Sequence, residues 1–592
     1  MKASRRESRK ARAAPPRPSV TPPKPVAWLP WTLAAAAALV VFWAYAPAAH
    51  GPFLFDDTVL KFALPGFEVP LRAWLVGQRP LLMATYWLNV RLSGEDPFSY
   101  HVFNVIFHCV AGGLIYWIVR RLLQWSGVEA ARRSLLAGLA AAIFLLHPVQ
   151  TEAVAYLAGR SEALSDMLVL AAFAVFLYRP AAAIAWLRVA AVVVLFLAAL
   201  LSKEQAVVLP ALLLLTDFWW NPGFSFEGIR RNWRLYAPLA AGAAYAVAHF
   251  WDLIVSTTAP SAGFGLKDLT WYQYFFTQCR ALFVYPGLFL FPAHLTADWD
   301  FPISRTILDH GALVGLLALL GLTGLAWRYR RQFRLASFGF FTYLLLMAPT
   351  SSIIPIRDPV AERRVYLSML GLLLIVVDLL GRLNLPRQAL MAVGAAVALI
   401  LAMATHARAQ VWSSAVALWE DTAQKSPNKP RVHFQLANSY CGPPCGGAEV
   451  DPPRCDLAVL EYEKTARLDK PSYNLLVDWA AAYDNCLHRP EDALAKLRQA
   501  AALDQTAHVY TQIAKVYGEQ QRWPQALDAL ATAEKLDPTF ATTFAYRGLI
   551  HFATNQMAAA VQDYQRALVL DPLLEPAKDG LAQAQARLRA AQ

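Results

Sequence analysis

The sequence predicts an all-α membrane protein built from two parts, a polytopic helical bundle followed by an α-solenoid. Of the 592 residues, 57% are hydrophobic and only 16% are charged, which is too apolar for a single soluble domain of this length. Apolar runs of membrane-spanning length recur up to about Arg408, and none follows it. After Arg408, similar helical segments follow one another at a nearly constant interval. These patterns place the bundle at residues 26–407 and the soluble part after it.

The first 25 residues are rich in arginine, lysine and proline and poor in apolar side chains. Such a segment cannot bury enough surface to fold, so we expect residues 1–25 to be a disordered basic cytosolic tail. The apolar run that begins at Val26 has no small residues at the spacing of a cleavage site, which favours a signal anchor over a removed signal peptide. Much of the net charge of +12 lies in this tail and in short loops, so it carries information on topology and does not indicate a nucleic-acid partner.

The bundle is expected to contain about eleven spans and one re-entrant or broken segment at residues 270–293. Five arginine-rich loops, among them the loop that holds Arg230 and Arg231, then fall on the side of the amino-terminal tail. Since basic loops remain in the cytosol, the amino terminus lies inside and the carboxyl terminus outside. In a bacterial cell this describes a multi-pass inner-membrane protein with a periplasmic solenoid. The expected spans are 26–46, 100–121, 133–147, 155–178, 183–201, 204–220, 234–255, 310–327, 335–350, 365–380 and 388–407.

On this topology the polar clusters of the bundle gather at its outer end. Asp56 and Asp57 stand side by side in the first outer loop, and acidic residues just beyond a span often mark a reacting site. His101, Asn104 and His108 recur at i, i+3 and i+7, so they share one face of the second span. A single charge at a helix end is explained by contact with lipid headgroups, but so many on one side predict a common site. The further candidates for substrate binding are His147, Glu152, Arg160, Glu162, Lys203, Glu204, Glu362 and Arg363.

These residue types suit a ligand that carries phosphate. Arginine and lysine neutralise a phosphate group, while a neighbouring carboxylate takes a proton from an acceptor hydroxyl. A lipid-phosphate sugar donor fits this description. The sequence shows no compact spacing of metal ligands, so no metal site and no cofactor are predicted. A divalent cation held by Asp56, Asp57, His101 or His108 remains an alternative.

Residues 431–572 repeat with a nearly constant period. Four helices open at alanines and end at aspartates, and the intervals between successive aspartates are 35, 33 and 34 residues, the tetratricopeptide (TPR) period. Each repeat buries its apolar face only against a neighbour, so about four repeats stack as one solenoid. Residues 408–430 are a linker or first helix, and residues 573–592 a capping helix. The alanines are Ala458, Ala493, Ala526 and Ala560, and the aspartates are Asp469, Asp504, Asp537 and Asp571.

Four cysteines fall in the first two repeats. Cys441, Cys445 and Cys455 lie in an insertion of the first repeat, and Cys486 lies in the equivalent turn of the second. In a segment that faces an oxidising compartment they predict two disulfides, for which three pairings exist. A zinc site is the alternative. The other two cysteines, Cys109 and Cys279, lie in apolar segments and are expected to be packing residues.

Taken together, these motifs resemble the transmembrane-and-TPR-containing O-mannosyltransferases of bacterial type, a branch of the GT-C glycosyltransferases. The resemblance covers nearly the whole chain after the tail. The resemblance rests on the order of the short motifs, on their expected location at the same side of the membrane and on the repeats that follow them in the sequence. The motifs are Asp56-Asp57, Tyr100-His101 with Asn104 and His108, the run 147–154, Gly159-Arg160-Ser161-Glu162, Leu201-Ser202-Lys203-Glu204 and Glu362-Arg363 with Tyr366.

The resemblance implies a GT-C-like bundle that moves a sugar such as mannose from a polyprenyl-phosphate carrier to a hydroxyl of a protein. It gives the role of catalytic base to Asp56 or Asp57, with Asp56 preferred, and adds Tyr366 to the substrate-binding residues. The family usually reads Glu-Arg-Tyr-Leu-Tyr where this chain has Glu-Arg-Arg-Val-Tyr from Glu362 to Tyr366. The role of Arg364 and the exact sugar therefore stay open.

Two other classes of protein share this architecture. One is a non-catalytic assembly factor whose bundle anchors a TPR scaffold, and the other is a polymerase or ligase of lipid-linked glycans. A scaffold has no need of charged residues gathered on one side, and polymerase and ligase relatives generally lack the Asp56-Asp57 loop. The sequence therefore favours an enzyme whose partners are a lipid-linked sugar donor, the membrane and a protein acceptor held by the TPR domain, with no nucleic acid.

Overall fold

The structure, a computed structural model, describes residues 28–59, 70–255 and 262–590. The expected cytosolic tail at 1–25 lies outside the described residues. Within them the fold is helical, and the only extended pairing is an isolated bridge between Ala262 and Ile356. The predicted all-α class is confirmed.

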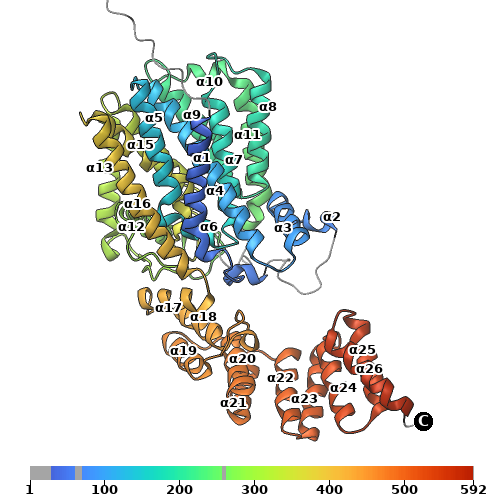
Figure 1. The fold of residues 1–592 in the computed structure, drawn as a ribbon. Coiled ribbons are helices and arrows are strands. Elements are labelled where there is room, and N and C mark those ends of the chain that lie inside the picture. Colours follow the sequence, from blue (N-terminus) through green and yellow to red (C-terminus); the bar gives the residue numbers. More distant parts are fainter. Residues whose placement is uncertain (1–27, 60–69, 256–261, 591–592) are drawn as a thin grey trace, which may run out of the picture.

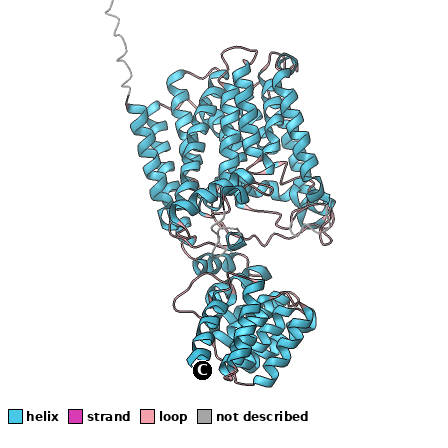
Figure 2. Ribbon diagram, turned by 90° about the vertical axis from the view of Figure 1, so that its right-hand side faces the viewer, coloured by secondary structure: helices cyan, strands magenta, loops and turns pink. Residues whose placement is uncertain are grey.

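The amino-terminal part is a bundle of helices that run roughly side by side (Figures 1 and 2). Its buried core is apolar and extends through most of the bundle helices. The helices are α1 (Leu29–Tyr45), α4 (Phe98–Trp125), α5 (Ala130–Leu146), α7 (Arg160–Leu177), α8 (Trp186–Leu200), α9 (Leu209–Trp220), α11 (Trp233–Val255), α12 (Trp271–Leu290), α13 (Ala312–Arg328), α14 (Arg334–Met347), α15 (Val365–Arg382) and α16 (Arg387–Val411).

Five helices of the described residues are long and apolar enough to cross a membrane, and six if one bent pair counts as a span. The bent pair consists of Ala130–Leu146 and Pro148–Ala155, with a bend of 49° between them. The five are Trp31–Ala48, Phe98–Trp125, Asp309–Arg328, Glu362–Arg382 and Arg387–Val411.

This number corrects the expectation of about eleven spans. Several predicted spans form helices too short to cross alone, since α8, α9 and α14 have 15, 12 and 14 residues. Others carry charge, as in α7, whose first turns hold Arg160, Glu162 and Asp166. Residues 270–293 were expected to be re-entrant or broken, but most of them form the continuous helix α12, which a capping box of Thr270 and Gln273 starts.

Short helices join the long ones at both ends of the bundle. Most lie at the end that faces the soluble part, where α2, α3 and α6 are seen in Figure 1, whereas α10 (Glu227–Arg231) lies at the opposite end. The former are η1 (Ala46–Ala48), η2 (Phe55–Val59), α2 (Leu71–Trp74), α3 (Pro80–Ser93), η4 (Pro148–Gln150), α6 (Thr151–Ala155), η5 (Glu204–Val208), η6 (Asp309–Gly311) and η7 (Glu362–Arg364).

Close packing of α14 on α15 fixes the segment that leads into α15. A Cβ atom at Gly371 would lie 2.5 Å from the carbonyl oxygen of Gly339, so the two backbones touch at a place that only glycine allows. Because α15 follows directly on η7, this contact also holds Glu362 and Arg363 in place.

The carboxyl-terminal part, residues 415–590, is a row of antiparallel helix pairs that extends away from the bundle (Figure 1). The alanines that mark the repeat, such as Ala458 and Ala493, are fully buried where paired helices meet. The last helix covers α25, with Ala577 and Ala584 buried beside Tyr564. The helices are α17 (Ala415–Lys425), α18 (Pro430–Cys441), η8 (Pro443–Cys445), α19 (Cys455–Leu468), α20 (Tyr473–Ala481), η9 (Ala482–Cys486), α21 (Pro490–Leu503), α22 (Ala507–Glu519), α23 (Trp523–Leu536), α24 (Ala541–Ala553), α25 (Met557–Leu570) and α26 (Glu575–Ala590).

Two disulfides connect the four cysteines of the first two repeats. Cys441 pairs with Cys445 across a turn, and Cys455 at the start of α19 pairs with Cys486 at the end of η9. The second bridge therefore ties the first repeat to the second. Cys109 and Cys279 are unpaired.

We expect the two bridges to differ in their contribution to stability. A bridge stabilises more when it closes a longer loop, and the separations are 31 residues for Cys455–Cys486 and 4 for Cys441–Cys445. Replacing both cysteines of a pair by alanine should cost about 4 kcal/mol for the longer loop and about 2 kcal/mol for the shorter one. Thermal unfolding of the full chain measures this. Protein from its native compartment with four reactive thiols besides Cys109 and Cys279 would contradict the pairing.

Candidate functional site

The two acidic residues of the loop after α1, Asp56 and Asp57, have different environments. Asp57 is buried, and its carboxylate accepts the backbone N–H groups of Leu54 at 3.0 Å and Ala158 at 2.7 Å. Asp56 is exposed, and its backbone N–H donates to the hydroxyl of Tyr156 at 2.9 Å. Asp57 thus fastens the loop to the segment before α7, while the carboxylate of Asp56 is accessible from outside.

Burial also changes the pKa of the Asp57 carboxyl group. Burial, with a smaller contribution from the charge of Asp56, raises the pKa of Asp57 from 3.8 to about 8 against the opposing effect of the two backbone N–H groups. Asp57 therefore keeps its proton at neutral pH, and the exposed Asp56 is the member of the pair that an acceptor can reach.

Four predicted residues form one chain of alternating charge next to this loop. The guanidinium of Arg363 pairs with Glu152 and lies 3.5 Å from Glu162, and the ammonium of Lys203 pairs with the same Glu162. The backbone N–H of Arg363 also donates to Glu152 at 2.8 Å. The side chain of Arg363 is 29% exposed, whereas those of Lys203, Glu162 and Glu152 are 9%, 4% and 3% exposed. Arg363 is therefore the cation of this set that a ligand reaches most easily.

Arg160 lies apart from this chain of charges, although the sequence placed it among the substrate-binding residues. Its side chain is fully buried, and its guanidinium donates to Asn104 at 2.8 Å, to Asn89 at 2.6 Å and to the carbonyl oxygen of Tyr100 at 2.8 Å. It also lies 4.3 Å from the centre of the Tyr86 ring. These contacts hold α3, α4 and α7 together, so we assign Arg160 a structural role.

Asn104 extends this structural connection to the acidic loop. Its amide nitrogen donates to the carbonyl oxygens of Val154 and Tyr156, both at 3.2 Å. Since Tyr156 holds the backbone of Asp56, Asn104 and Arg160 together fix the position of the candidate base.

The three predicted histidines are buried and bonded to other parts of the protein. Nε2 of His108 bonds to the carbonyl oxygen of Leu145 at 3.1 Å, which leaves Nδ1 to accept the hydroxyl of Tyr366 at 2.8 Å. A ring nitrogen of His101 contacts the carbonyl oxygen of Gly51 at 3.1 Å. The corresponding partner of His147 is the carbonyl oxygen of Phe289, at 3.0 Å.

These contacts make the histidines and Tyr366 packing residues around the site. The described residues contain no group of three or more histidine, cysteine, aspartate or glutamate side chains that could hold a metal ion.

The last two candidates lie on either side of the site. Glu204 pairs with Arg79, the residue before α3, at 2.7 Å, and both side chains are 35% exposed. Glu362 is fully buried, and its carboxylate accepts the backbone N–H of Thr296 at 2.5 Å. Arg79 was not among the sequence candidates, and nothing in the sequence distinguishes it from its neighbours Arg72 and Arg91.

The beginning of the solenoid is docked on two loops of the bundle by a four-residue ionic cluster, which we call the latch. Arg431 of α18 binds Asp298 at 2.7 Å and Asp358 at 2.7 Å, and Lys429 pairs with the same two carboxylates. The guanidinium of Arg431 also lies 5.3 Å from the ring centre of Phe55, the neighbour of Asp56. The latch therefore brings the first TPR helices against the acidic loop.

The latch is charged over a wide pH range. Burial raises the pKa of Asp358, but the charges of Arg431 and Lys429 outweigh it and bring the pKa down to about 2. The stabilisation is thus complete above the ordinary value of 3.8 and is lost as the pH falls through about 2.

We expect Arg431→Glu to release the solenoid from the bundle, because the new carboxylate faces two others. Limited proteolysis between α16 and α18 should become several-fold faster, and a second change, Asp358→Arg, should restore resistance. Arg467→Glu is the control, since Arg467 is an exposed arginine of α19 outside the latch. Equal cleavage of the Arg431 and Arg467 variants would show that the latch does not hold the solenoid.

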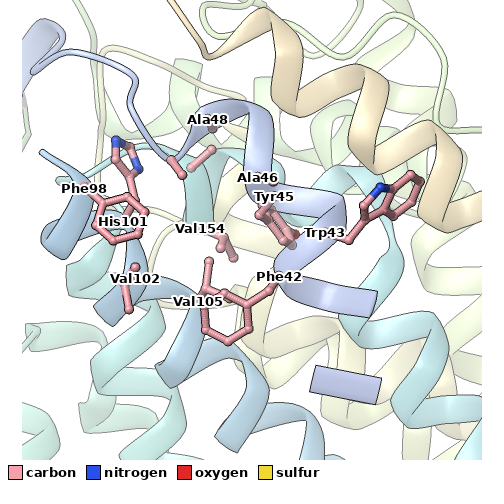
Figure 3. A pocket seen from close by; sticks show the side chains of 12 residues that line it. Phe42, Trp43, Tyr45, Ala46, Ala48, Phe98, His101, Val102, Val105 and Val154 are labelled. Atoms are coloured by element: carbon pink, nitrogen blue, oxygen red, sulfur yellow. The ribbon is translucent and has the colours of Figure 1, made fainter. Parts of the chain in front are cut away.

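An apolar groove lies beside the acidic loop, between the ends of α1 and α4 (Figure 3). It has a volume of about 370 Å³. His101 closes one side, while Val154 and Ala155 connect it to the segment that holds Asp56 and Asp57. Its other lining residues are Phe42, Trp43, Tyr45, Ala46, Ala48, Ala49, Phe98, Val102 and Val105.

Comparison with known proteins gives partial matches. No protein-family model matches the chain. Mouse protein O-mannosyl-transferase TMTC3 is 37% identical over 131 residues, which are 22% of this chain and 13% of that protein. Protein O-mannosyl-transferase Tmtc1 of Drosophila melanogaster is 39% identical over 129 residues, 22% of this chain and 14% of that protein. Protein O-mannosyl-transferase F38B6.6 of Caenorhabditis elegans is 23% identical over 373 residues, 60% of this chain and 50% of that protein.

The curated homologues are thus named protein O-mannosyl-transferases, and the chain spans between 13% and 50% of the length of these three. Among solved structures, the crystal structure of MamA aligns with 26% of this chain and 86% of its own, at 19% identity and a TM-score of 0.23. The crystal structure of YrrB, a TPR protein with an unusual peptide-binding site, aligns with 28% of this chain and 80% of its own, at 18% identity and a TM-score of 0.23.

Proposed function

We propose that the chain is a GT-C-type membrane glycosyltransferase, which moves a sugar, with mannose as the first candidate, from a polyprenyl-phosphate carrier to a hydroxyl of a protein. One observation carries the proposal: the hydroxyl of Tyr156 holds the backbone of the exposed Asp56, and the charges of Asp56 and of the partly exposed Arg363 both act on this tyrosine. The names of the curated homologues support the same reaction.

The residues divide the chemistry as follows. The acceptor oxygen forms a bond to the anomeric carbon of the sugar as the bond from that carbon to the carrier phosphate breaks. The hydroxyl proton passes to Asp56, and the departing phosphate takes the bonding electrons. Arg363, with Lys203 behind it, stabilises the negative charge that develops on this phosphate. Glu152 and Glu162 hold the two cations in position.

The apolar groove of Figure 3 suits the hydrocarbon chain of the donor. Its walls are aromatic and aliphatic, and it lies in the wall of the bundle at the level of the acidic loop. A hydrocarbon chain bound in this groove places the phosphate of the donor near the polar end of α4. The hydrocarbon chain itself then avoids contact with water.

The solenoid is proposed to present the protein acceptor. A cavity of about 630 Å³ opens at its first repeat, with Tyr440, Glu461 and Lys464 among the lining residues. Because the latch docks this repeat on the bundle, an extended peptide bound there lies near Asp56.

We also propose the arrangement of domains expected from the sequence, with a basic tail at 1–25, a bundle at 26–407, a linker at 408–430, TPR repeats at 431–572 and a cap at 573–592. The bundle is proposed to span the bacterial inner membrane with the solenoid in the periplasm. Of the helices too short to cross alone, α9 and α14 have no exposed residue and pack inside the bundle, whereas α8 keeps one side exposed. A divalent cation at the site is not required by this proposal.

Transfer of radiolabelled mannose from a mannosyl polyprenyl phosphate to protein tests the function. Membranes that contain the full chain should label protein, and membranes with an Asp56→Asn chain at matched expression should not. No label in either preparation, with other sugars also inactive, would favour the non-catalytic scaffold.

The topology has a separate test. Single cysteines at Arg231 and Ala531, both exposed in the structure, should react with a membrane-impermeant thiol reagent from opposite sides. We expect the position of Arg231 to react only after the cells are opened, and that of Ala531 to react in intact spheroplasts. A cytosolic Ala531 would overturn the proposed orientation.

A further inference from the structure

The opposite end of the bundle, far from the solenoid, holds a second polar pocket. It lies where α4, α7 and α9 end and α14 begins, near α10 at the upper end of Figure 1. Its volume is about 260 Å³. The lining residues are Trp125, Arg179, Asp217, Trp220, Asn221 and Arg334.

The pocket carries a net positive charge. Arg179 pairs with the buried carboxylate of Asp217 at 2.6 Å. The other oxygen of Asp217 already accepts the hydroxyl of Tyr236 at 2.7 Å and the amide of Asn232 at 3.4 Å. Since this carboxylate compensates only one of the two arginines, the charge of Arg334 remains for a ligand.

Arg334 is held in a fixed position. It donates to the carbonyl oxygen of Trp219 at 2.7 Å, and the indole N–H of Trp219 donates back to the carbonyl oxygen of Arg334 at 2.9 Å. Its guanidinium lies 4.7 Å from the centre of the Trp220 ring. The pocket is therefore built before any ligand arrives.

Three buried donors around this pocket have no acceptor among the residues that the structure describes. They are Nη1 of Arg179, Nε of Arg334 and Nε1 of Trp220. A buried donor without a partner costs about 1–3 kcal/mol, and one such group occurs in many proteins. Three such donors at one pocket, with no buried unpaired side-chain acceptor among its described lining residues, match a ligand that only accepts hydrogen bonds.

We propose that this pocket binds the phosphate group of an anionic ligand, with the headgroup of an acidic phospholipid or free phosphate as the two sources. Phosphate offers acceptors alone and pairs well with guanidinium groups. The tryptophans at the ends of apolar helices place the pocket at the level of lipid headgroups, on the side that the arginine-rich loops assign to the cytosol. The site is separate from the proposed sugar transfer, and its test does not depend on that activity.

The test uses the full chain and compares two probes. Native mass spectrometry of protein in nanodiscs of phosphatidylglycerol or phosphatidylcholine detects a retained lipid, and titration calorimetry with inorganic phosphate detects the free anion. Binding of phosphatidylglycerol alone assigns a lipid site, and binding of inorganic phosphate assigns a general phosphate site. Either result supports the proposal, and no binding of either probe by the wild type overturns it.

Three variants connect the binding to this pocket. Arg334→Gln should abolish the bound anion, and Trp220→Phe, which keeps the ring and removes its N–H, should weaken binding about tenfold. Arg179 is left unchanged, because its removal would strand the buried Asp217. The control is Arg331→Gln, the same loss of charge at an exposed arginine outside the pocket. Equal binding by the wild type and the first two variants would place the anion elsewhere and overturn the proposal.

Discussion

Asp56→Asn is expected to lower sugar transfer by about 10²–10⁴-fold, the usual contribution of a general base. The side chain is exposed, and the structure assigns its loop contact to the backbone N–H, which asparagine keeps. The thermal unfolding temperature should therefore stay close to that of the wild type. The measurement is transfer of labelled sugar at saturating donor, together with a melting curve of the same preparation.

Asp57→Asn is the matched control, because it makes the same chemical change one residue away. An amide has one oxygen where the carboxyl group of Asp57 uses two, so either Leu54 or Ala158 loses its acceptor. We expect a loss of about 1–3 kcal/mol of stability, with the fall in activity following the misplaced loop.

The pH dependence of stability distinguishes the two variants further. The folded protein keeps the proton of Asp57 up to about pH 8, while the unfolded chain loses it near the ordinary pKa of 3.8. The wild type should therefore lose stability as the pH rises between these values, and Asp57→Asn should remove this slope.

If Asp56→Asn retains full activity at matched expression, Asp56 is not the base.

The second large expected effect is the difference between substitutions at Arg160 and at Arg363 in their consequences for stability and turnover. Arg160→Gln should cost about 3 kcal/mol or more, because buried partners on α3 and α4 lose a charged donor. Any activity left in the folded fraction should show an unchanged KM for the donor. Arg363→Gln should instead lower the turnover of the folded fraction by about 10²-fold, since its side chain is partly exposed and is proposed to face the developing phosphate charge. It should also cost stability, because the buried Glu152 loses its ion-pair partner.

Melting curves and donor titrations of both variants measure this contrast. Arg363→Lys serves as the conservative variant, and it should restore part of the turnover because it keeps the charge and loses the planar donor pair. If the Arg160 variant is stable and has a raised KM for the donor, Arg160 binds the substrate and its role is not only structural.

The local pattern of residues in the sequence predicted the helical fold class and the candidate site residues that share one helix face. The spacing of His101, Asn104 and His108 predicted one face of a helix, and all three are buried on α4. The recurring alanines predicted where paired helices of the solenoid meet, since only a small side chain fits there, and Ala458 and Ala493 are fully buried. Such features depend on neighbours three or four residues away, which the sequence displays directly.

The roles of the individual site residues depended on contacts between distant segments. In the sequence Asp56 and Asp57 are equivalent neighbours, and only the approach of Ala158, about 100 residues later, buries one and leaves the other exposed. Arg160 and Arg363 were both assigned to phosphate, yet Arg160 is enclosed by polar groups from other helices.

The number of spans and the cysteine pairing also required the tertiary structure. Hydropathy marks an apolar segment but does not show whether it is one straight helix or a shorter helix covered by its neighbours, so about eleven predicted spans compare with five long helices in the described residues. Four cysteines allow three pairings, and the fold selects one by bringing the start of α19 against the end of η9. The sequence by itself thus determined the helices, the repeats and the types of residue at the site, because these follow from local periodicity and chemistry. The tertiary structure alone decided which carboxylate and which cation face outward, because burial and long-range hydrogen bonds exist only once the chain has folded.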